Sequence, residues 1–429
     1  MFLSFIRLLI GNTIVTSGLK KHGLVLFLLF SVPLLATAQT TLSLKQAIAL
    51  TLTHNPELKA LPFKTQALEG EKQELSLRPP LHIGLEFENF AGNGKNQGID
   101  ALESTVTLGS VLELNNKRQL RLSAIDAKIA VAQMQQKTNT LDTLGALTIH
   151  FIEALKTQES ILIAKEEQAL ATKSVSIVNK KAQQGAAADI DIQRAKVTLA
   201  RINIQLDALV SQQQQQYRSL SQFWGESNPS YNQLAGELYV QPSNSFYKAL
   251  LQQVKASPHA QQLTLANRIK DMQYQLSVAE GHSNIDWSVG LKHINDSGDA
   301  ALVAGISTTL NQSQRNQGRI AAASAEKNAF NAAQKNAMQT LETQLFIAHS
   351  QRTHHAKAMR SISTIIIPAL SEALTLSQQA YESGRYTYFD WSMAQQALFE
   401  AKHRLLEHAT TTLISQALIE QLTGEPFAP

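Results

Sequence analysis

The stretch GAAADIDIQRAKVTLARINIQLDAL, residues 185–209, decides the fold of this 429-residue chain. After its glycine, apolar residues recur at alternating spacings of three and four, at Ile192, Ala195, Leu199, Ile202, Leu206 and Leu209. This is the spacing of the apolar seam of a coiled coil. A second seam, with a spacing of seven, passes through Ile190, Val197 and Ile204. An ordinary two-helix coiled coil needs one seam, whereas a helix in the wall of a helical barrel needs two, because it contacts neighbours on both sides.

The same pattern returns 199 residues later, in GRYTYFDWSMAQQALFEAKHRLLEH at 384–408. Its seam consists of Trp391, Ala394, Leu398, Ala401, Leu405 and His408. The glycines that end these helices, Gly225 and Gly424, have the same separation. We therefore predict two structural repeats, since internal repeats at a fixed period indicate repeated architecture. The expected boundaries are a first repeat at 39–225, a linker at 226–244, a second repeat at 245–424 and a tail at 425–429.

Each repeat is expected to hold one strand hairpin and one helical hairpin. The strand hairpins are predicted at about 81–114 and about 284–310, and the helical hairpins at about 117–223 and about 314–422. The first arms of the helical hairpins would run from Lys117 to about Ala182 and from Gln314 to about Tyr381. Pro368 lies inside the second arm and must kink or divide it, because proline removes a backbone donor and clashes one turn back. Low aromatic content, 6%, fits long helices better than a compact enzyme.

The strand segments alternate apolar and polar residues, as a strand between lipid and water does. The apolar members are Leu81, Ile83, Leu85 and Phe87 in one repeat, and Ile285, Trp287, Val289 and Leu291 in the other. Four strands cannot close a membrane barrel, and open edges would be unsatisfied in lipid. Strands of several protomers would therefore share one barrel, with about eight strands in a dimer or about twelve in a trimer. The residues alone do not choose between the two.

The first 38 residues predict export. Lys20 and Lys21 precede an apolar run at 24–35, and Ala36-Thr37-Ala38 forms a small-residue cleavage site before Gln39. The alternative is a membrane anchor, but the run is short for a spanning helix. Without these residues, 35 basic residues face 34 acidic ones, so nothing favours nucleic acid as a partner. The chain has no cysteine, which excludes disulfides, thiolate sites and a lipid-modified N-terminal cysteine.

The whole mature chain resembles the TolC-type outer-membrane efflux proteins. Three segments resemble their metal-efflux, CzcC-like branch: residues 86–94 (EFENFAGNG), 112–118 (LELNNKR) and 314–320 (QRNQGRI). The branch usually has glycines where Asn115 and Asn116 stand, and asparagine also tolerates left-handed backbone. The resemblance implies a mainly α chain with a small β part. It also implies a trimer with a roughly twelve-stranded outer-membrane β-barrel on a periplasmic α-helical barrel.

The resemblance also implies four residues at the periplasmic aperture. Asp191 and Asp390, each six residues after its repeat's glycine, would line the closed tip, although acids at helix starts are also common caps. Tyr381 matches a tyrosine that ties helix pairs together by hydrogen bonding, expected here to the Asp191 carboxylate. Arg385 is one place nearer the glycine than the family's arginine.

No motif supports an enzyme, a cofactor or a metal site. Histidines 349, 354 and 355 precede the second glycine turn, and 403 and 408 follow it, but spacings of five and six do not align two ligands on one helix face. We interpret them as a hydrated helix surface. The expected function is the exit duct of a tripartite efflux system in the outer membrane of a Gram-negative bacterium, extending into the periplasm. It would work with a periplasmic adaptor and an inner-membrane RND pump that exports heavy-metal cations. A drug-efflux or type I secretion duct shares the fold, and a periplasmic coiled-coil adaptor is the alternative of another class.

Overall fold

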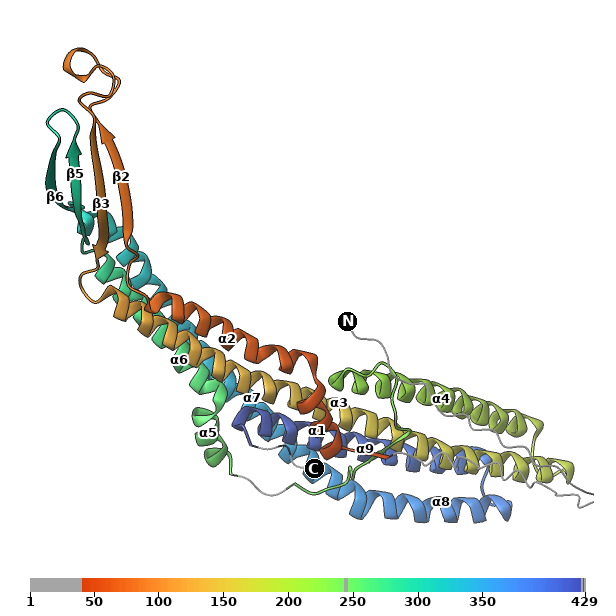
Figure 1. Ribbon diagram of the computed structural model, residues 1–429. Helices are drawn as coiled ribbons and strands as arrows, with labels where there is room; N and C mark the ends of the chain where they lie inside the picture. The colour runs from red at the N-terminus through yellow and green to blue at the C-terminus, as the bar shows by residue number, and fades with distance from the viewer. Residues whose placement is uncertain (1–40, 243–245, 426, 428–429) are drawn as a thin grey trace, which may run out of the picture. The chain divides into compact units, whose positions relative to one another are not determined.

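The computed structural model describes residues 41–242, 246–425 and 427, so the predicted signal peptide at 1–38 lies outside the described residues. The described part is mostly helical with a small β part, as predicted (Figure 1). The strands are β1 Thr41–Ser43, β2 His82–Glu88, β3 Glu103–Leu112, β4 Gln233–Ala235, β5 Ile285–Ile294 and β6 Asp299–Thr308. The helices are α1 Leu44–His54, α2 Pro56–Ser76, α3 Lys117–Gln183, α4 Asp189–Ser221, α5 Tyr247–Ala256, α6 Pro258–Glu280, α7 Gln312–Ser361, α8 Ile367–Glu382 and α9 Tyr388–Thr423. Of the helices described, none combines the length and the apolar character needed to cross a membrane.

The first helical hairpin consists of α3 and α4, joined at Gly185. Helix α3 has 67 residues, which at about 1.5 Å per residue makes it roughly 100 Å long. Gly185 has φ +74°, a left-handed conformation that only glycine adopts without strain, and it ends the helix. Gly384, with φ +77°, does the same between α8 and α9. The sheet therefore lies at one end of α3 and the glycine turn at the other.

Pro368 divides the long arm of the second hairpin, as its chemistry predicts. A π-helical turn over Ile362–Ile366 separates α7 from α8, and Pro368 follows at the start of α8. Proline has no N–H to donate to the carbonyl of Thr364, so the helix widens locally instead of forming that bond. The continuous predicted helix 314–381 is thus two helices with a wider turn between them.

The predicted seams pack differently. In the first seam, Ala195 and Ile202 are buried, and α4 packs along α3, which also contacts α9. The second seam is uncovered within this chain: Ile190, Val197 and Ile204 are 58%, 50% and 71% exposed. One face of α4 therefore presents an apolar stripe that no described part of the chain covers.

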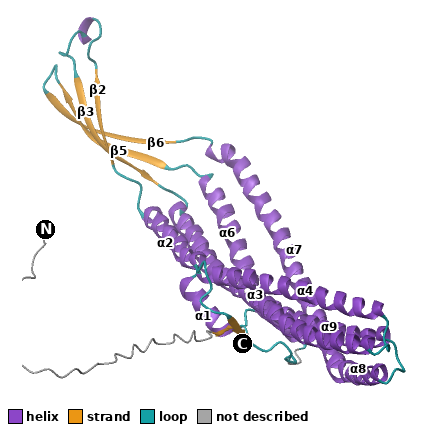
Figure 2. Cartoon of the chain, turned by 90° about the vertical axis from the view of Figure 1, so that its right-hand side faces the viewer, coloured by secondary structure: helices purple, strands orange, loops and turns teal. Residues whose placement is uncertain are grey.

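A four-stranded antiparallel sheet has the order β2-β3-β5-β6, so the two strand hairpins form one sheet (Figure 2). Its register places Leu85, Val106, Leu291 and Leu302 side by side in one row. Those four side chains are all at least half exposed, which confirms the predicted apolar face. The opposite face is polar, and there Lys292 bridges Glu88 and Glu103 at 2.7 and 2.5 Å.

The junctions between the sheet and the long helices contain left-handed asparagines. Asn115 and Asn116 have φ of 59° and 56°, as their substitution for glycine predicts, and Asn311 before α7 has φ 59°. Lys117, the first residue of α3, links the two repeats. Its buried ammonium donates to the His282 carbonyl and to the Asn284 side chain, which both precede β5.

The segment 226–244, expected as a simple linker, is packed where the structure describes it. Strand β4 pairs in parallel with β1 in register Leu42↔Leu234. Tyr231, Leu234 and Leu238 are buried against Phe151 of α3 and its neighbours. The prolines and glycines of this segment predict that it forms no regular helix. They give no signal that its apolar residues pack into the core.

Candidate functional site

An aromatic cluster joins both helical hairpins at the end where their glycine turns lie. Its buried members come from all four arms: Val178 of α3, Ala195 of α4, Tyr381 of α8, and Tyr388 and Trp391 of α9. Because both turns are tied to one cluster, Asp191 and Tyr381 belong to the same end of the hairpins, as the sequence predicts. Trp391 is fully buried and Tyr381 is 4% exposed.

Tyr381 lies at the centre of this cluster. Its ring stacks on Trp391 with centroids 5.2 Å apart and an interplanar angle of 21°, and meets Tyr388 edge-on. Lys181 of α3 places its ammonium 4.6 Å from the centroid of the Tyr381 ring and donates to the Tyr381 carbonyl. The cation therefore contacts both the π face and the backbone of one residue, a combination that favours a fixed helix position.

The predicted hydrogen bond from Tyr381 to Asp191 is not formed. The Tyr381 hydroxyl is buried and has no hydrogen-bond partner in the described part of the chain. Asp191 instead pairs with Arg194 on its own helix, at 3.5 Å. Burial raises the pKa of the Tyr381 hydroxyl, and the nearby Asp191 charge raises that pKa further. The two residues are electrostatic neighbours without a direct bond.

Asp390 acts as part of a helix cap. Its carboxylate accepts from the Thr387 backbone N–H at 3.0 Å and from the Thr387 hydroxyl at 2.6 Å, while Thr387 caps α9 in return. The Thr387 side chain and then its backbone hold the pKa of Asp390 below its usual value. The carboxylate is exposed, so capping and a second role at the surface are compatible.

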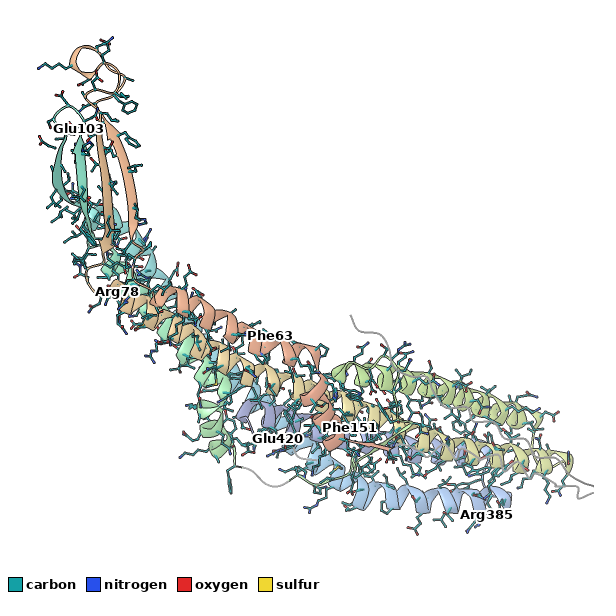
Figure 3. All side chains as sticks on the ribbon, in the orientation of Figure 1. Phe63, Arg78, Glu103, Phe151, Arg385 and Glu420 are labelled. Carbon is teal, nitrogen blue, oxygen red and sulfur yellow. The ribbon has the colours of Figure 1, made fainter. Side chains whose placement is uncertain are left out.

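The Arg385 side chain bonds within its own glycine turn. Its Nε donates to the Ser383 hydroxyl at 3.1 Å within the glycine turn. Figure 3 shows Arg385 at this turn, far along the chain's helices from Glu103 of the sheet. The sequence missed Lys181 as a partner of Tyr381. Lys181 lies four residues before Gly185 and carries no local signal for that contact.

The described residues contain no group of three or more His, Cys, Asp or Glu side chains arranged to hold a metal ion. An apolar cavity of about 500 Å³ lies between α3, α9 and the 235–242 segment. Phe151 and Glu420 are among its lining residues, and both are labelled in Figure 3.

The chain is similar to known proteins over 89–90% of its length. No protein-family model matches it. The chain is 21% identical over 387 residues to the cobalt-zinc-cadmium resistance protein CzcC of Cupriavidus metallidurans, covering 89% of this chain and 90% of that protein. The crystal structure of CusC, which concerns conformational changes during folding and transmembrane channel formation, superposes with a TM-score of 0.76 at 14% identity, over 89% of this chain and 92% of CusC. The outer membrane protein VceC of Vibrio cholerae superposes with a TM-score of 0.76 at 16% identity, over 90% of this chain and 97% of VceC.

The chain has the fold of the TolC-type outer-membrane channel proteins. Its two strand hairpins and two helical hairpins are those of the TolC-type fold, and its sequence similarity lies with the CzcC-like branch. In this fold the glycine turns at Gly185 and Gly384 are the ends of the helical hairpins farthest from the sheet, so the aromatic cluster lies at the distal tip.

Proposed function

We propose that the chain is one protomer of the outer-membrane exit duct of a tripartite efflux system that exports heavy-metal cations. The substrate class follows from the full-length similarity to a protein named for cobalt, zinc and cadmium resistance. The location follows from the TolC-type fold. A duct selects substrates poorly, so the pump and not this chain would set the choice among metals.

One observation carries the proposal: the sheet has an exposed apolar face and two open edges. Strands β2 and β6 are its edges, and each pairs with one strand only within the described residues. They run in opposite directions, because three antiparallel pairings separate them. An edge β6 beside the β2 of another protomer would therefore continue the antiparallel order. Three protomers would close a barrel of about twelve strands with its apolar face in lipid.

The helical part supports the same assembly. The uncovered stripe of Ile190, Val197 and Ile204 faces away from α3, so a neighbouring protomer could cover it as in the wall of a helical barrel. We infer that three copies surround a tunnel across the periplasm. A periplasmic adaptor would link the tunnel to an inner-membrane RND pump.

We also propose that the end with the two glycine turns is the periplasmic aperture. Asp191 and Asp390 lie in the first turns of α4 and α9, beside those turns. Three copies of each carboxylate around a narrow pore would attract cations and repel anions. In the closed state Tyr381 would hold the tip through its stack with Trp391. Arg385 would contribute charge near the opening without contacting the tyrosine.

Membrane fractionation tests the assembly. The mature chain should appear in the outer-membrane fraction as a trimer that survives detergent without boiling and dissociates with it. A chain recovered as soluble periplasmic protein would favour the adaptor alternative and reject the duct.

Deletion of the encoding gene tests the substrate class. Zinc, cobalt and cadmium should inhibit the deletion strain at lower concentrations than the parent, with drug sensitivity unchanged. Sensitivity to drugs and not to metals would assign the same fold to drug efflux, and defective export of a protein would assign it to secretion.

A further inference from the structure

Two histidines that are far apart in the sequence meet between α7 and α9. The Nδ1 atoms of His355 and His408 lie 2.7 Å apart, within hydrogen-bond distance, and their ring centroids are 4.9 Å apart. His354 adds a third ring, edge-on to His355 at 5.2 Å. Because a hydrogen bond needs one donor and one acceptor, one of the two facing nitrogens must be unprotonated and accept through its lone pair, which a metal ion could use in place of the proton. The pair therefore presents at least one nitrogen ready to bind an electrophile.

His355 and His408 both lie at seam positions of their helices, and each is partly buried. On α7 the buried residues facing α9 follow the spacing of a seam, at Leu345, Ala348, Arg352, Met359 and Ile362, and His355 takes the remaining place between Arg352 and Met359. On α9, His408 is the polar member of the seam that starts at Trp391. A polar pair in a seam lowers stability compared with apolar residues. Packing alone therefore does not explain why two imidazoles face each other at this place.

We propose that His355 and His408 form a two-imidazole binding site for a borderline divalent transition-metal cation such as Zn²⁺ or Cu²⁺. Imidazole nitrogens bind these metals at 2.0–2.1 Å, so two of them on one tetrahedral ion lie about 3.3 Å apart. The observed separation of 2.7 Å is about 0.6 Å shorter, and rotation of the two rings supplies that difference without moving the helices. The ion would displace the proton that the nitrogens now share.

The surroundings keep such a site open and exchangeable. Burial first, and then His408 and His354, hold the pKa of His355 below its usual value, which favours the neutral ring that binds metal. Glu407 acts on the pKa of His355 in the opposite direction and offers a carboxylate nearby. The pair supplies two protein ligands, so water would complete the coordination of the ion. Binding would be reversible, unlike that of a closed structural site.

The inference concerns the helical wall and does not require the duct to export metals. It is tested on the assembled full-length mature protein in detergent, with Cu²⁺ alone as the probe. At less than one Cu²⁺ per chain, electron paramagnetic resonance should show the unpaired electron of Cu²⁺ coupled to two imidazole nitrogens. His355→Gln and His408→Gln should each reduce the coupling to one nitrogen and weaken binding by about tenfold or more, because the second ligand acts at high effective concentration. His54→Gln, on the exposed end of α1, is the matched control and should bind as the unaltered protein does.

A second measurement separates metal binding from a purely structural role. Zn²⁺ should raise the thermal midpoint of the unaltered protein and of His54→Gln, because a ligand that binds the folded state stabilises it. It should leave the midpoints of both pair variants unchanged. A pair that only sets the helix register would change the midpoint of the metal-free protein and leave the response to Zn²⁺ intact, which would overturn the inference. A one-nitrogen spectrum from the unaltered protein would overturn it even if neither variant assembled.

Discussion

Tyr381 and Trp391 stack across the Gly384 turn with ring centroids 5.2 Å apart and an interplanar angle of 21°. The stack joins the last turn of α8 to the first turn of α9, and Lys181 of α3 lies over the Tyr381 ring. Three helices of the two hairpins thus meet at one aromatic ring. The contact found at this end of the hairpins is an aromatic stack with a cation, where the sequence predicts a hydrogen bond from the Tyr381 hydroxyl.

Trp391→Ala should loosen the tip. Trp391 is fully buried, so its truncation should cost about 3–5 kcal/mol and leave a cavity between α8 and α9. We expect a lower thermal midpoint and a higher single-channel conductance in a planar bilayer. Phe389→Ala is the control, because Phe389 is two residues away and 56% exposed. Equal conductance in the two variants would remove the stack from the closing mechanism.

Tyr381→Phe should leave the closed tip intact. The hydroxyl is buried without a partner in the described residues, so its removal breaks no hydrogen bond and should change the free energy of unfolding by less than about 1 kcal/mol. Tyr381→Leu removes the stack and the contact with Lys181, and should raise single-channel conductance. A raised conductance in Tyr381→Phe itself would show that the hydroxyl does bond to Asp191 in the assembled channel.

The Asp390 carboxylate should make the thermal stability of the folded protein fall at low pH. Its pKa is lowered in the folded chain, so its contribution is complete above the ordinary value of 3.8 and is lost as pH falls through the folded value. Asp390→Asn should therefore lose less thermal stability than the unaltered protein between pH 6 and pH 3. Asp189→Asn is the control, because the start of α4 has no capping side chain. An identical loss in Asp390→Asn and the unaltered protein would mean that the capping box is not formed in solution.

Local patterns predicted the elements well. The left-handed glycines at Gly185 and Gly384 could be predicted because a long apolar periodicity stops there and resumes. Helix α3 begins at the predicted Lys117 and ends one residue after the predicted Ala182. Alternation in β2 and β5 predicted which face of the sheet is apolar, since side chains of a strand point to opposite faces in turn.

Contacts between distant segments were not predictable in the same way. The pairing of β1 with β4 joins two three-residue strands almost 200 residues apart, and neither is long enough to show alternation. The residues proposed for the aperture lie at the end with the glycine turns, but their hydrogen bonds depend on side-chain directions that sequence spacing does not give. Lys181 contacts Tyr381. Asp191 forms an ion pair with Arg194 of its own helix. The His355–His408 pair likewise needs the relative position of two helices.

Leu291→Arg should prevent assembly of the barrel, whereas Ser288→Arg should be tolerated. Leu291 lies in the apolar row with Val106 and Leu302 and is 61% exposed in the single chain, so the proposed barrel would place it against lipid. An arginine near the middle of the bilayer on that face should cost about 2–4 kcal/mol. Ser288 points to the polar face, where its neighbours across the two adjacent strands are Gly109 and Gly305, so a longer side chain has room to extend into the lumen. The fraction of heat-sensitive trimer in unboiled outer-membrane samples measures both effects. Leu291→Arg should reduce this fraction and Ser288→Arg should keep it near that of the unaltered protein. Equal trimer yields would mean that the apolar face does not meet lipid, because only lipid contact makes the two faces differ in their tolerance of a charge.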